Sequence, residues 1–213
     1  MSKVWLIRHG ESVSNANLPT THPAESALTS RGEEEAKLIP PAFQQAPDLI
    51  VVSPYLRARQ TAVPTQAKFP NVAVEEWPVY EFTYLHPERY NGTTGSGRGP
   101  YAQAYWERND PFEKEQGEGE SFAELILRAQ ELLQRLTENS AEFIAVFSHG
   151  LFLRAVLWHL ITGIGEPTTD AMWRYQQFVG SVWMPNCSML ELSVSENHPI
   201  MFSGFLTDHL AIN

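Results

Sequence analysis

The chain has 213 residues, of which 43% are hydrophobic, enough to bury one substantial core without requiring a second full domain. Its formal net charge of −10 excludes general binding to nucleic acid or to an anionic membrane, because both would repel it. No apolar run is long enough to span a membrane or form a signal peptide, and the single cysteine, Cys187, excludes an internal disulfide. We therefore expect a single domain over residues 1–213, located in the cytoplasm, with no nucleic-acid or membrane partner.

Short apolar runs in the first third of the chain predict strands. Residues 4–7 and residues 49–52 are both apolar and both end in polar residues, as buried strands do where they open into loops. Residues 72–74 predict another short strand.

Two helices are expected to follow the first two strands. Ser30 and Glu33 have the spacing of a capping box, which predicts a helix from Ser30 to a stop at Pro40 and the proline after it. Ser53 is followed by a proline, a good helix cap before a favourable first helical residue. That second helix is expected to end near Pro64.

Between Phe82 and Glu120 the sequence shows neither a strand pattern nor a helix pattern, and glycines interrupt aromatic and charged residues. A long irregular stretch in a compact domain is usually a functional loop. We expect residues 82–120 to be a lid or specificity segment inserted after the third strand.

Regular patterns return in the second half of the chain. Ser121 and Glu124 form a second capping box, and apolar residues then recur at steps of three and four up to Leu136, which predicts an amphipathic helix. Residues 143–147 predict a buried strand, residues 151–160 a helix packed on most sides, and residues 189–194 and 201–206 two closing strands. Alternating strands and helices predict an α/β fold, a three-layer sandwich with a largely parallel central sheet.

Three groups of polar residues are expected where predicted strands end. Arg8 and His9 follow the first strand, Arg57 lies in the first turn of the helix after the second, and His149 follows the strand that starts at Phe143. In open α/β sheets, ligands bind beyond the carboxyl ends of the strands. If these strands are neighbours, two histidines and two arginines meet in one crevice.

These residue types suit phosphoryl transfer. The guanidinium groups of Arg8 and Arg57 can hold phosphoryl oxygens with paired hydrogen bonds. An unprotonated imidazole, that of His9, can attack phosphorus and form a phosphohistidine, while His149 donates to the transferring group. The leaving group needs a proton, for which Glu81 is the candidate acid.

The segment Arg8-His9-Gly10-Glu11-Ser12, followed by Asn15, resembles the signature of the histidine phosphatase superfamily, on the branch related to cofactor-dependent phosphoglycerate mutase. Further segments of this chain resemble other motifs of that family and occur in the same order along the chain, and together the matches cover the chain up to about Leu160. They are Leu28-Thr29-x-x-Gly32 with Ala36, Ser53-x-x-x-Arg57-Ala58-x-x-Thr61-Ala62, Glu81, Gly119-Glu120-Ser121 and Ser148-His149-Gly150.

The resemblance implies a phosphoglycerate mutase-like fold and a phosphohistidine at His9. It also implies proton transfer by Glu81. We expect no metal and no cofactor. The groups implied to bind the phosphoryl group are those of Arg8, Asn15, Arg57 and His149, and the catalytic set is His9, Glu81, His149, Arg8 and Arg57.

Departures from the family patterns favour hydrolysis. Glu11-Ser12 after Gly10, and Gly150 after His149, disfavour the acid-phosphatase branch. The substrate loop of the true mutases is replaced by a different sequence after Glu81. We therefore predict a metal-independent phosphatase for phosphomonoesters, with mutase-type phosphotransfer or a non-catalytic phospho-ligand-binding regulator as alternatives. A small phosphorylated metabolite is the expected substrate, a phosphoprotein also fits, and the oligomeric state stays open.

Simpler interpretations remain for several of these residues. Glu81 could be an ordinary surface carboxylate, and Asn15 could simply shape a turn. Three arginines of the 82–120 segment, Arg89, Arg98 and Arg108, could supply substrate contacts, but charged loop residues are usually only solvated, so none of the three is assigned to the site. The remaining histidines lack close metal-ligand spacing, so no metal site is assigned to them.

Overall fold

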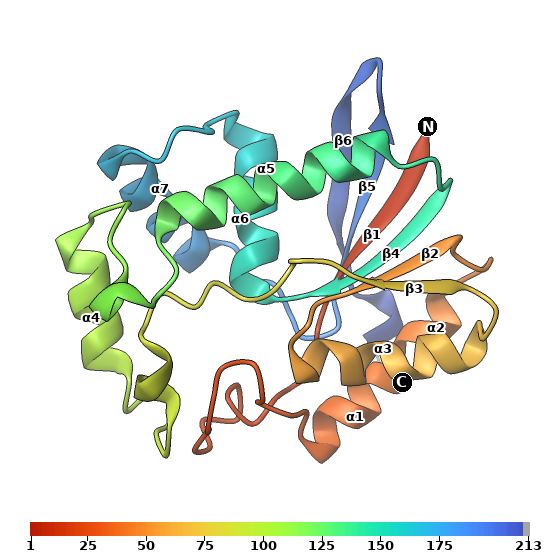
Figure 1. Ribbon diagram of the computed structural model, residues 1–213. Helices are drawn as coiled ribbons and strands as arrows, with labels where there is room; N and C mark the ends of the chain where they lie inside the picture. The colour runs from red at the N-terminus through yellow and green to blue at the C-terminus, as the bar shows by residue number, and fades with distance from the viewer. Residues whose placement is uncertain (211–213) are drawn as a thin grey trace.

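The computed structural model describes residues 1–210, and its centre is a six-stranded sheet in the order β3-β2-β4-β1-β5-β6 (Figure 1). Strands β3, β2, β4 and β1 pair in parallel, whereas β5 is antiparallel to β1, and β6 is antiparallel to β5. The strands are β1 (Ser2–Arg8), β2 (Leu49–Val52), β3 (Ala73–Glu76), β4 (Phe143–Ser148), β5 (Met189–Ser195) and β6 (His198–Leu206). The predicted α/β fold with a largely parallel sheet is confirmed.

Helices cover both faces of this sheet. Trp5 and Ile7 point into the core beneath the first group of helices, and Val4 and Leu6 point into the core beneath the second, because neighbouring strand residues face opposite ways. The first group is α1 (Ser30–Lys37), α2 (Ile39–Ala42) and α3 (Leu56–Lys68), and the second is α5 (Phe122–Glu138), α6 (Gly150–Thr162) and α7 (Thr169–Ser181). The three-layer sandwich is confirmed.

Helix α5 forms as its sequence predicts. The Ser121 hydroxyl accepts a hydrogen bond from the Glu124 amide at 3.2 Å, and the Glu124 carboxylate accepts one from the Ser121 amide at 2.9 Å. The apolar residues that recur at steps of three and four are all buried in the core. They are Phe122, Leu125, Ile126, Ala129, Leu132, Leu133 and Leu136. A reciprocal cap and a continuous apolar face are both local signals, which is why the sequence suffices here.

The predicted capping residue and the predicted stop of the first helix are wrong. Its cap is Thr29, whose hydroxyl accepts a hydrogen bond from the Gly32 amide at 3.1 Å, so Ser30 is already the first helical residue. The helix ends at Lys37, and Pro40 lies in the first turn of α2 instead of terminating α1. Proline is tolerated there because the first turn of a helix has no intrahelical partner for its amide.

The bounds predicted for the second helix are also wrong. Helix α3 begins at Leu56 with Tyr55 at its cap position, so Ser53 does not cap it. The helix continues through Pro64 to Lys68. Its face toward the sheet is buried on both sides of Pro64, at residues 62 and 65, and we attribute the continuation to this packing.

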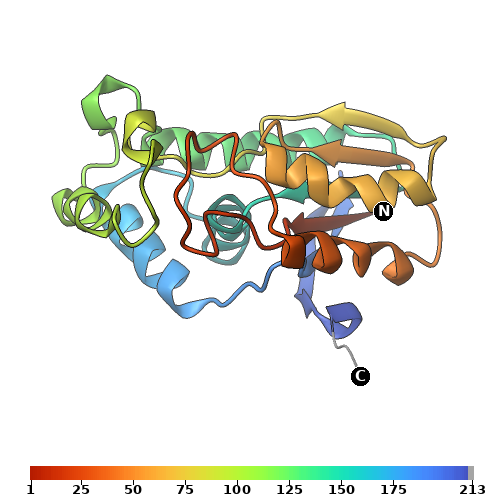
Figure 2. The ribbon, with the colours of Figure 1, turned by 90° about the horizontal axis from the view of Figure 1, so that it is seen from below.

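Residues 82–120, called the insertion below, follow the third strand as expected. The insertion is less irregular than its sequence suggests, because it contains helix α4 (Gly99–Arg108) and two 3-10 turns, Pro87–Tyr90 and Glu115–Gly117. Helix α7 was not expected either. In Figure 2, the loop that follows β1 runs between the insertion and helices α1 and α3.

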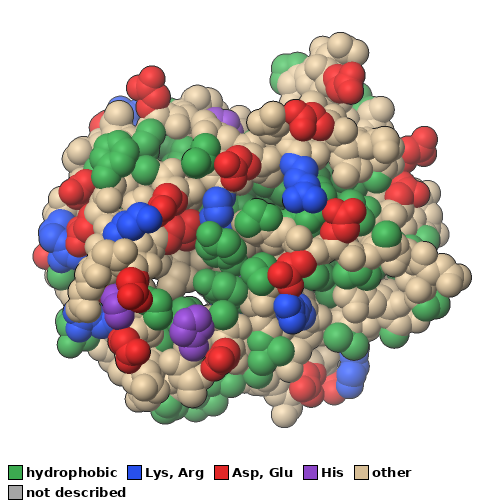
Figure 3. Space-filling view, in the orientation of Figure 1, with side chains coloured by type: hydrophobic (Ala, Val, Ile, Leu, Met, Phe, Trp, Pro, Cys, Tyr) green, Lys and Arg blue, Asp and Glu red, His purple; other side chains and the backbone are tan. Residues whose placement is uncertain are grey.

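Lysine and arginine side chains lie among acidic ones on the face drawn in Figure 3, and do not gather in one basic patch. Within residues 1–210, no helix is both long and apolar enough to cross a membrane. A further 3-10 turn, Asp208–Leu210, closes the described part of the chain.

Candidate active site

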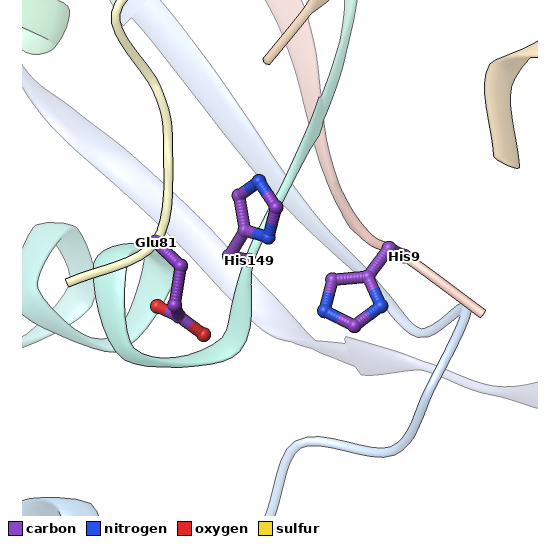
Figure 4. A group of neighbouring side chains, drawn as sticks. All are labelled: His9, Glu81 and His149. Carbon is purple, nitrogen blue, oxygen red and sulfur yellow. The ribbon is translucent and has the colours of Figure 1, made fainter. Parts of the chain in front are cut away.

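The two histidines of the sequence motifs lie side by side where β1 and β4 end. These strands are parallel neighbours with Arg8 opposite Ser148, so the residues that follow, His9 and His149, leave the sheet at the same edge. Their ring centroids are 5.1 Å apart. Glu81 approaches from the segment before the insertion, and one ligand atom of each of the three side chains lies within 4.8 Å of the others (Figure 4).

The backbone around His9 is held by glycines and a threonine of the sequence motifs. The Gly10 amide donates a hydrogen bond to the Thr61 hydroxyl of α3 at 3.1 Å. A Cβ added at Gly10 would lie 2.5 Å from the Gly32 carbonyl oxygen, and one added at Gly32 would lie 2.0 Å from the Glu11 carbonyl oxygen. The two glycines therefore allow the loop after β1 and helix α1 to approach closely, which fixes the position of His9.

The hydrogen-bond partners of His9 determine its tautomer. Its Nδ1 lies 2.7 Å from the Gly10 carbonyl oxygen, which can only accept, so Nδ1 carries the proton. Its Nε2 accepts a hydrogen bond from Nε of Arg57 at 3.0 Å, so this nitrogen keeps its lone pair. Burial, together with the charges of Arg57 and Arg8, holds the pKa of His9 well below its usual value of 6.5. His9 is a neutral imidazole with an unprotonated Nε2.

His149 is completely buried, and Ser53 orients its ring. Nε2 lies 2.7 Å from the Ser53 hydroxyl, which also accepts a hydrogen bond from the Tyr55 amide. Within residues 1–210, Nδ1 is buried and has no hydrogen-bond partner. If the Ser53 hydroxyl donates to Nε2, the proton of His149 lies on Nδ1. Burial and the Arg57 charge hold the pKa of His149 well below its usual value.

Glu81 is anchored at the beginning of helix α6. Its Oε1 accepts hydrogen bonds from the amides of Leu151 at 3.0 Å and Phe152 at 3.1 Å, and also from that of Phe82. In Figure 4, its carboxylate and the His9 ring face the same space from opposite sides. The carboxylate is therefore held at the site by its own backbone contacts, and is not an ordinary solvated surface group.

The two predicted arginines occupy different positions. Arg57 is buried, lines the cavity beside His9, and also donates to the Pro23 carbonyl oxygen at 2.8 Å. Arg8 lies behind this cavity, where it donates to the Met184 carbonyl oxygen. A Cβ added at Gly150 would lie 3.1 Å from Nε of Arg8. Gly150 thus lets the Arg8 guanidinium approach the beginning of helix α6.

Asn15 both shapes a turn and lines the cavity. Its Oδ1 accepts hydrogen bonds from the amide and hydroxyl of Ser12 at 3.2 and 3.0 Å, as expected of a turn residue. Its side-chain nitrogen, Nδ2, donates to no group in residues 1–210, so the two hydrogens of Nδ2 are available to a bound ligand that lies in the cavity.

His9, Glu81 and His149 are also close enough to share a metal ion. The charges around them disfavour a cation, because the guanidinium groups of Arg57 and Arg8 act on both histidines. The same positive charges favour an anion that carries several oxygen atoms.

The insertion forms the other wall of a cavity of about 230 Å³ whose floor contains His9 and Arg57. Arg98, Tyr84 and Tyr90 line this wall. The expectation that Arg98 is solvated is wrong, because its side chain is only 6% exposed. No periodicity or spacing distinguishes it from the other arginines of the insertion, so the sequence did not single out Arg98 among the three candidates for substrate contact.

Comparisons with known proteins agree with this geometry. The sequence model described as "Histidine phosphatase superfamily (branch 1)" matches residues 4–201. A comparison with curated protein sequences gave no significant match.

Similar solved structures share the fold at low sequence identity. A phosphoserine phosphatase from Entamoeba histolytica, in complex with 3-phosphoglyceric acid, has 20% identity and a TM-score of 0.73, and the match covers 99% of this chain and 100% of that one. A putative alpha-ribazole-5'-P phosphatase from Escherichia coli has 23% identity and a TM-score of 0.68, with 91% of each chain covered. A mycobacterial glucosyl-3-phosphoglycerate phosphatase has 22% identity and a TM-score of 0.68, with 95% of this chain and 96% of that one covered. The chain belongs to branch 1 of the histidine phosphatase superfamily.

Proposed function

We propose that the protein is a metal-independent phosphatase that hydrolyses phosphomonoesters through a phosphohistidine on His9. The observation that carries this proposal is the tautomer of His9, whose Nε2 lone pair faces the cavity beside Arg57. A buried imidazole that stays neutral at physiological pH is a competent nucleophile toward phosphorus.

In the first step, Nε2 of His9 attacks phosphorus while the bond from phosphorus to the ester oxygen breaks. The arriving phosphoryl group displaces the hydrogen bond between Arg57 and His9, and the guanidinium group then donates to phosphoryl oxygens. The Nδ1 proton of His149 and the amide of Asn15 stabilise the same oxygens. The departing alkoxide takes a proton from Glu81.

In the second step, water replaces the alcohol. The Glu81 carboxylate, now deprotonated, accepts a proton from a water molecule that attacks the phosphohistidine. The bond between phosphorus and Nε2 breaks, inorganic phosphate leaves, and His9 and Glu81 regain their starting protonation states. One carboxyl group thus acts as acid and then as base, which closes the cycle.

A small phosphorylated metabolite fits the cavity better than a phosphoprotein. The volume of about 230 Å³ is below the range of roughly 300–1,000 Å³ in which drug-sized ligands bind. Similar solved structures include phosphatases named for phosphoserine and for glucosyl-3-phosphoglycerate, which supports this substrate class. The insertion then acts as the lid over the substrate.

Turnover of an aryl phosphate by wild-type protein and by His9→Ala tests the proposal. We expect a loss on the order of 10⁴-fold or more in His9→Ala, as for removal of other enzymatic nucleophiles. His198→Ala, at an exposed position in β6, is the matched control and should retain full activity. A chelator should have no effect on the wild type, and a quench that avoids acid should trap phosphorylated protein only when His9 is present.

Three results would contradict the proposal. They are unchanged turnover in His9→Ala, loss of activity with chelator, and isomerisation of phosphoglycerate that depends on a bisphosphorylated primer in place of hydrolysis. Stabilisation by phosphate without any trapped phosphohistidine would instead indicate a phospho-ligand-binding regulator.

A further inference from the structure

Arg98 is a buried cation whose partners in residues 1–210 are all neutral. Its Nη1 donates to the Thr20 hydroxyl at 3.1 Å and to the carbonyl and hydroxyl oxygens of Thr93 at 2.9 and 3.0 Å. Its Nη2 donates to the Ser14 hydroxyl at 3.3 Å, and its guanidinium carbon lies 4.4 Å from the centre of the Tyr90 ring. No carboxylate balances this charge within the part of the chain that the structure describes.

A buried arginine just after the insertion, on helix α5, has a carboxylate partner. Arg128 is 8% exposed and pairs with the Glu120 carboxylate at 2.7 Å. The more exposed Arg89 and Arg108 of the insertion also contact acids, Glu115 and Glu113 respectively. A charge removed from water without a counter-charge is costly, so Arg98, like Arg57 beside His9, calls for an anion from outside the chain.

The unused donors of Arg98 form one side of its guanidinium group. Nη1 is saturated by its three oxygen partners, whereas Nη2 has one partner and Nε has none in residues 1–210. Nε and Nη2 together make a fork that matches the two oxygens of a carboxylate. Ser14 lies beside this fork, and both residues line the cavity that contains His9.

The surroundings fix the charge of this side chain. Burial lowers the pKa of Arg98, yet a guanidinium group remains protonated because its starting value is so high. The facing phenols of Tyr84 and Tyr90 stay neutral, because burial raises the pKa of each. The insertion side of the cavity therefore presents one positive charge and no negative one to the ligand.

We propose that Arg98 and Ser14 form a second anion subsite, which binds a carboxylate group of the substrate while the phosphoryl group lies at His9. A single cation suits a carboxylate, which carries one negative charge, better than a second phosphate, which carries about two. The small cavity requires the two anionic groups to lie a short distance apart on one compact molecule. This proposal rests on the proposed function, because Arg98 and Ser14 would bind the carboxylate end of the same substrate whose phosphoryl group is transferred to His9.

Matched substrate pairs test the subsite. One pair is 3-phosphoglycerate and glycerol 3-phosphate, and the other is O-phosphoserine and phosphoethanolamine, where the second member of each pair lacks the carboxylate. A hydrogen bond to a charged group contributes about 1.5–3 kcal/mol, so we expect kcat/KM of the wild type to favour a carboxylated member by roughly 10- to 100-fold. In Arg98→Gln this ratio should fall to near one, and Arg98→Lys should restore part of it.

Arg108→Gln is the control, because it removes one positive charge from an exposed site on the insertion, and it should keep the wild-type ratio. If Arg98 only holds the insertion in place, Arg98→Gln lowers kcat/KM for both members of a pair equally and the ratio is unchanged, which overturns the proposal. Equal use of both members by the wild type also overturns it. Turnover of an aryl phosphate by wild type and by His9→Ala is measured in parallel. If this turnover depends on His9, the proposed function holds even when the carboxylate subsite is wrong.

Discussion

The cavity has two walls of different construction. On the sheet side, His9 and Arg57 line the cavity, and His149 lies next to His9. All three are buried side chains held by short polar contacts to motif residues and by glycines that bring backbone segments together. On the insertion side, the loop after β1 is tied to the insertion by the hydrogen bonds of Arg98 to Thr20 and Ser14 and by exposed contacts, among them two hydrogen bonds between Asn17 and Ser96.

This difference in construction suggests that the sheet side carries out the chemical step and that the insertion side selects the substrate. Groups that contact the phosphoryl group must be aligned within a fraction of an ångström, and the sheet supplies that rigidity. Groups that contact the rest of the substrate can vary between relatives, and an insertion tolerates such change. Substitutions on the sheet side should therefore lower kcat, and substitutions on the insertion side should mainly raise KM or change specificity.

After His9→Ala, Arg57→Ala should cause the largest loss among the variants of the two walls. It removes a buried donor that contacts both His9 and the proposed phosphoryl position, so we expect kcat/KM to fall by about 10³-fold. Arg59→Ala is the matched control on the same helix, since Arg59 forms an exposed pair with Glu76, and it should stay within about twofold of wild type. Steady-state kinetics with an aryl phosphate measures both variants. Equal losses in the two would show that a general effect on α3, and not the site, is responsible.

His149→Gln should cost about 10²-fold in kcat, because one preorganised donor to the developing charge is lost. Ser53→Ala should cost less, about tenfold, because it leaves the imidazole in place and removes only the hydroxyl at Nε2. His159→Gln, farther along α6, is the control and should retain activity. A larger loss in Ser53→Ala than in His149→Gln would contradict the assignment of His149 as the donor.

The sheet side could be predicted from the sequence, since strand ends and motif residues are local signals. The run of residues 49–52 and the capping box at Ser121 were sufficient to place β2 and helix α5. The cap of α1 could not be chosen locally, because Thr29 and Ser30 both carry hydroxyls. Thr29 also hydrogen-bonds to the Glu11 carboxylate, a contact between distant segments.

The insertion side could not be predicted, because its arginines differ only in their tertiary partners. Arg89 and Arg108 form ion pairs with carboxylates, whereas Arg98 donates hydrogen bonds to hydroxyls and a carbonyl. The sequence alone does not predict which of these partners each arginine contacts. The roles of His9, Arg57 and Glu81 remain predictions that geometry supports and that only kinetics can decide.

The buried histidines of the sheet side should make the protein less stable in mild acid. In the folded state, burial and the Arg57 charge hold the pKa values of His9 and His149 well below 6.5, near which the unfolded chain titrates. Above pH 6.5 neither state is protonated and nothing changes, but below it the unfolded state binds more protons. The free energy of unfolding should fall by about 1 kcal/mol for each histidine between pH 6.5 and 5.5.

Denaturant unfolding at several pH values, in buffers without phosphate, measures this slope. His149→Gln should remove about half of the decrease, because one of the two buried imidazoles is gone. A stability that stays flat down to pH 5.5 in the wild type would mean that the buried imidazoles accept protons in the folded state, and it would contradict the neutral His9 on which the mechanism depends.

The smallest effect is expected where the two walls are tied together. Asn17 has a left-handed backbone with φ of 56°, so Asn17→Gly removes its two hydrogen bonds to Ser96 without adding strain. These bonds are exposed and contribute about 0.5–1 kcal/mol each at most, so KM should rise about two- to fivefold while kcat stays within twofold. Asn197→Gly, in the turn between β5 and β6, is the control. A loss in kcat with an unchanged KM would show that the insertion aligns the reacting groups, and the division between the two walls would then be wrong.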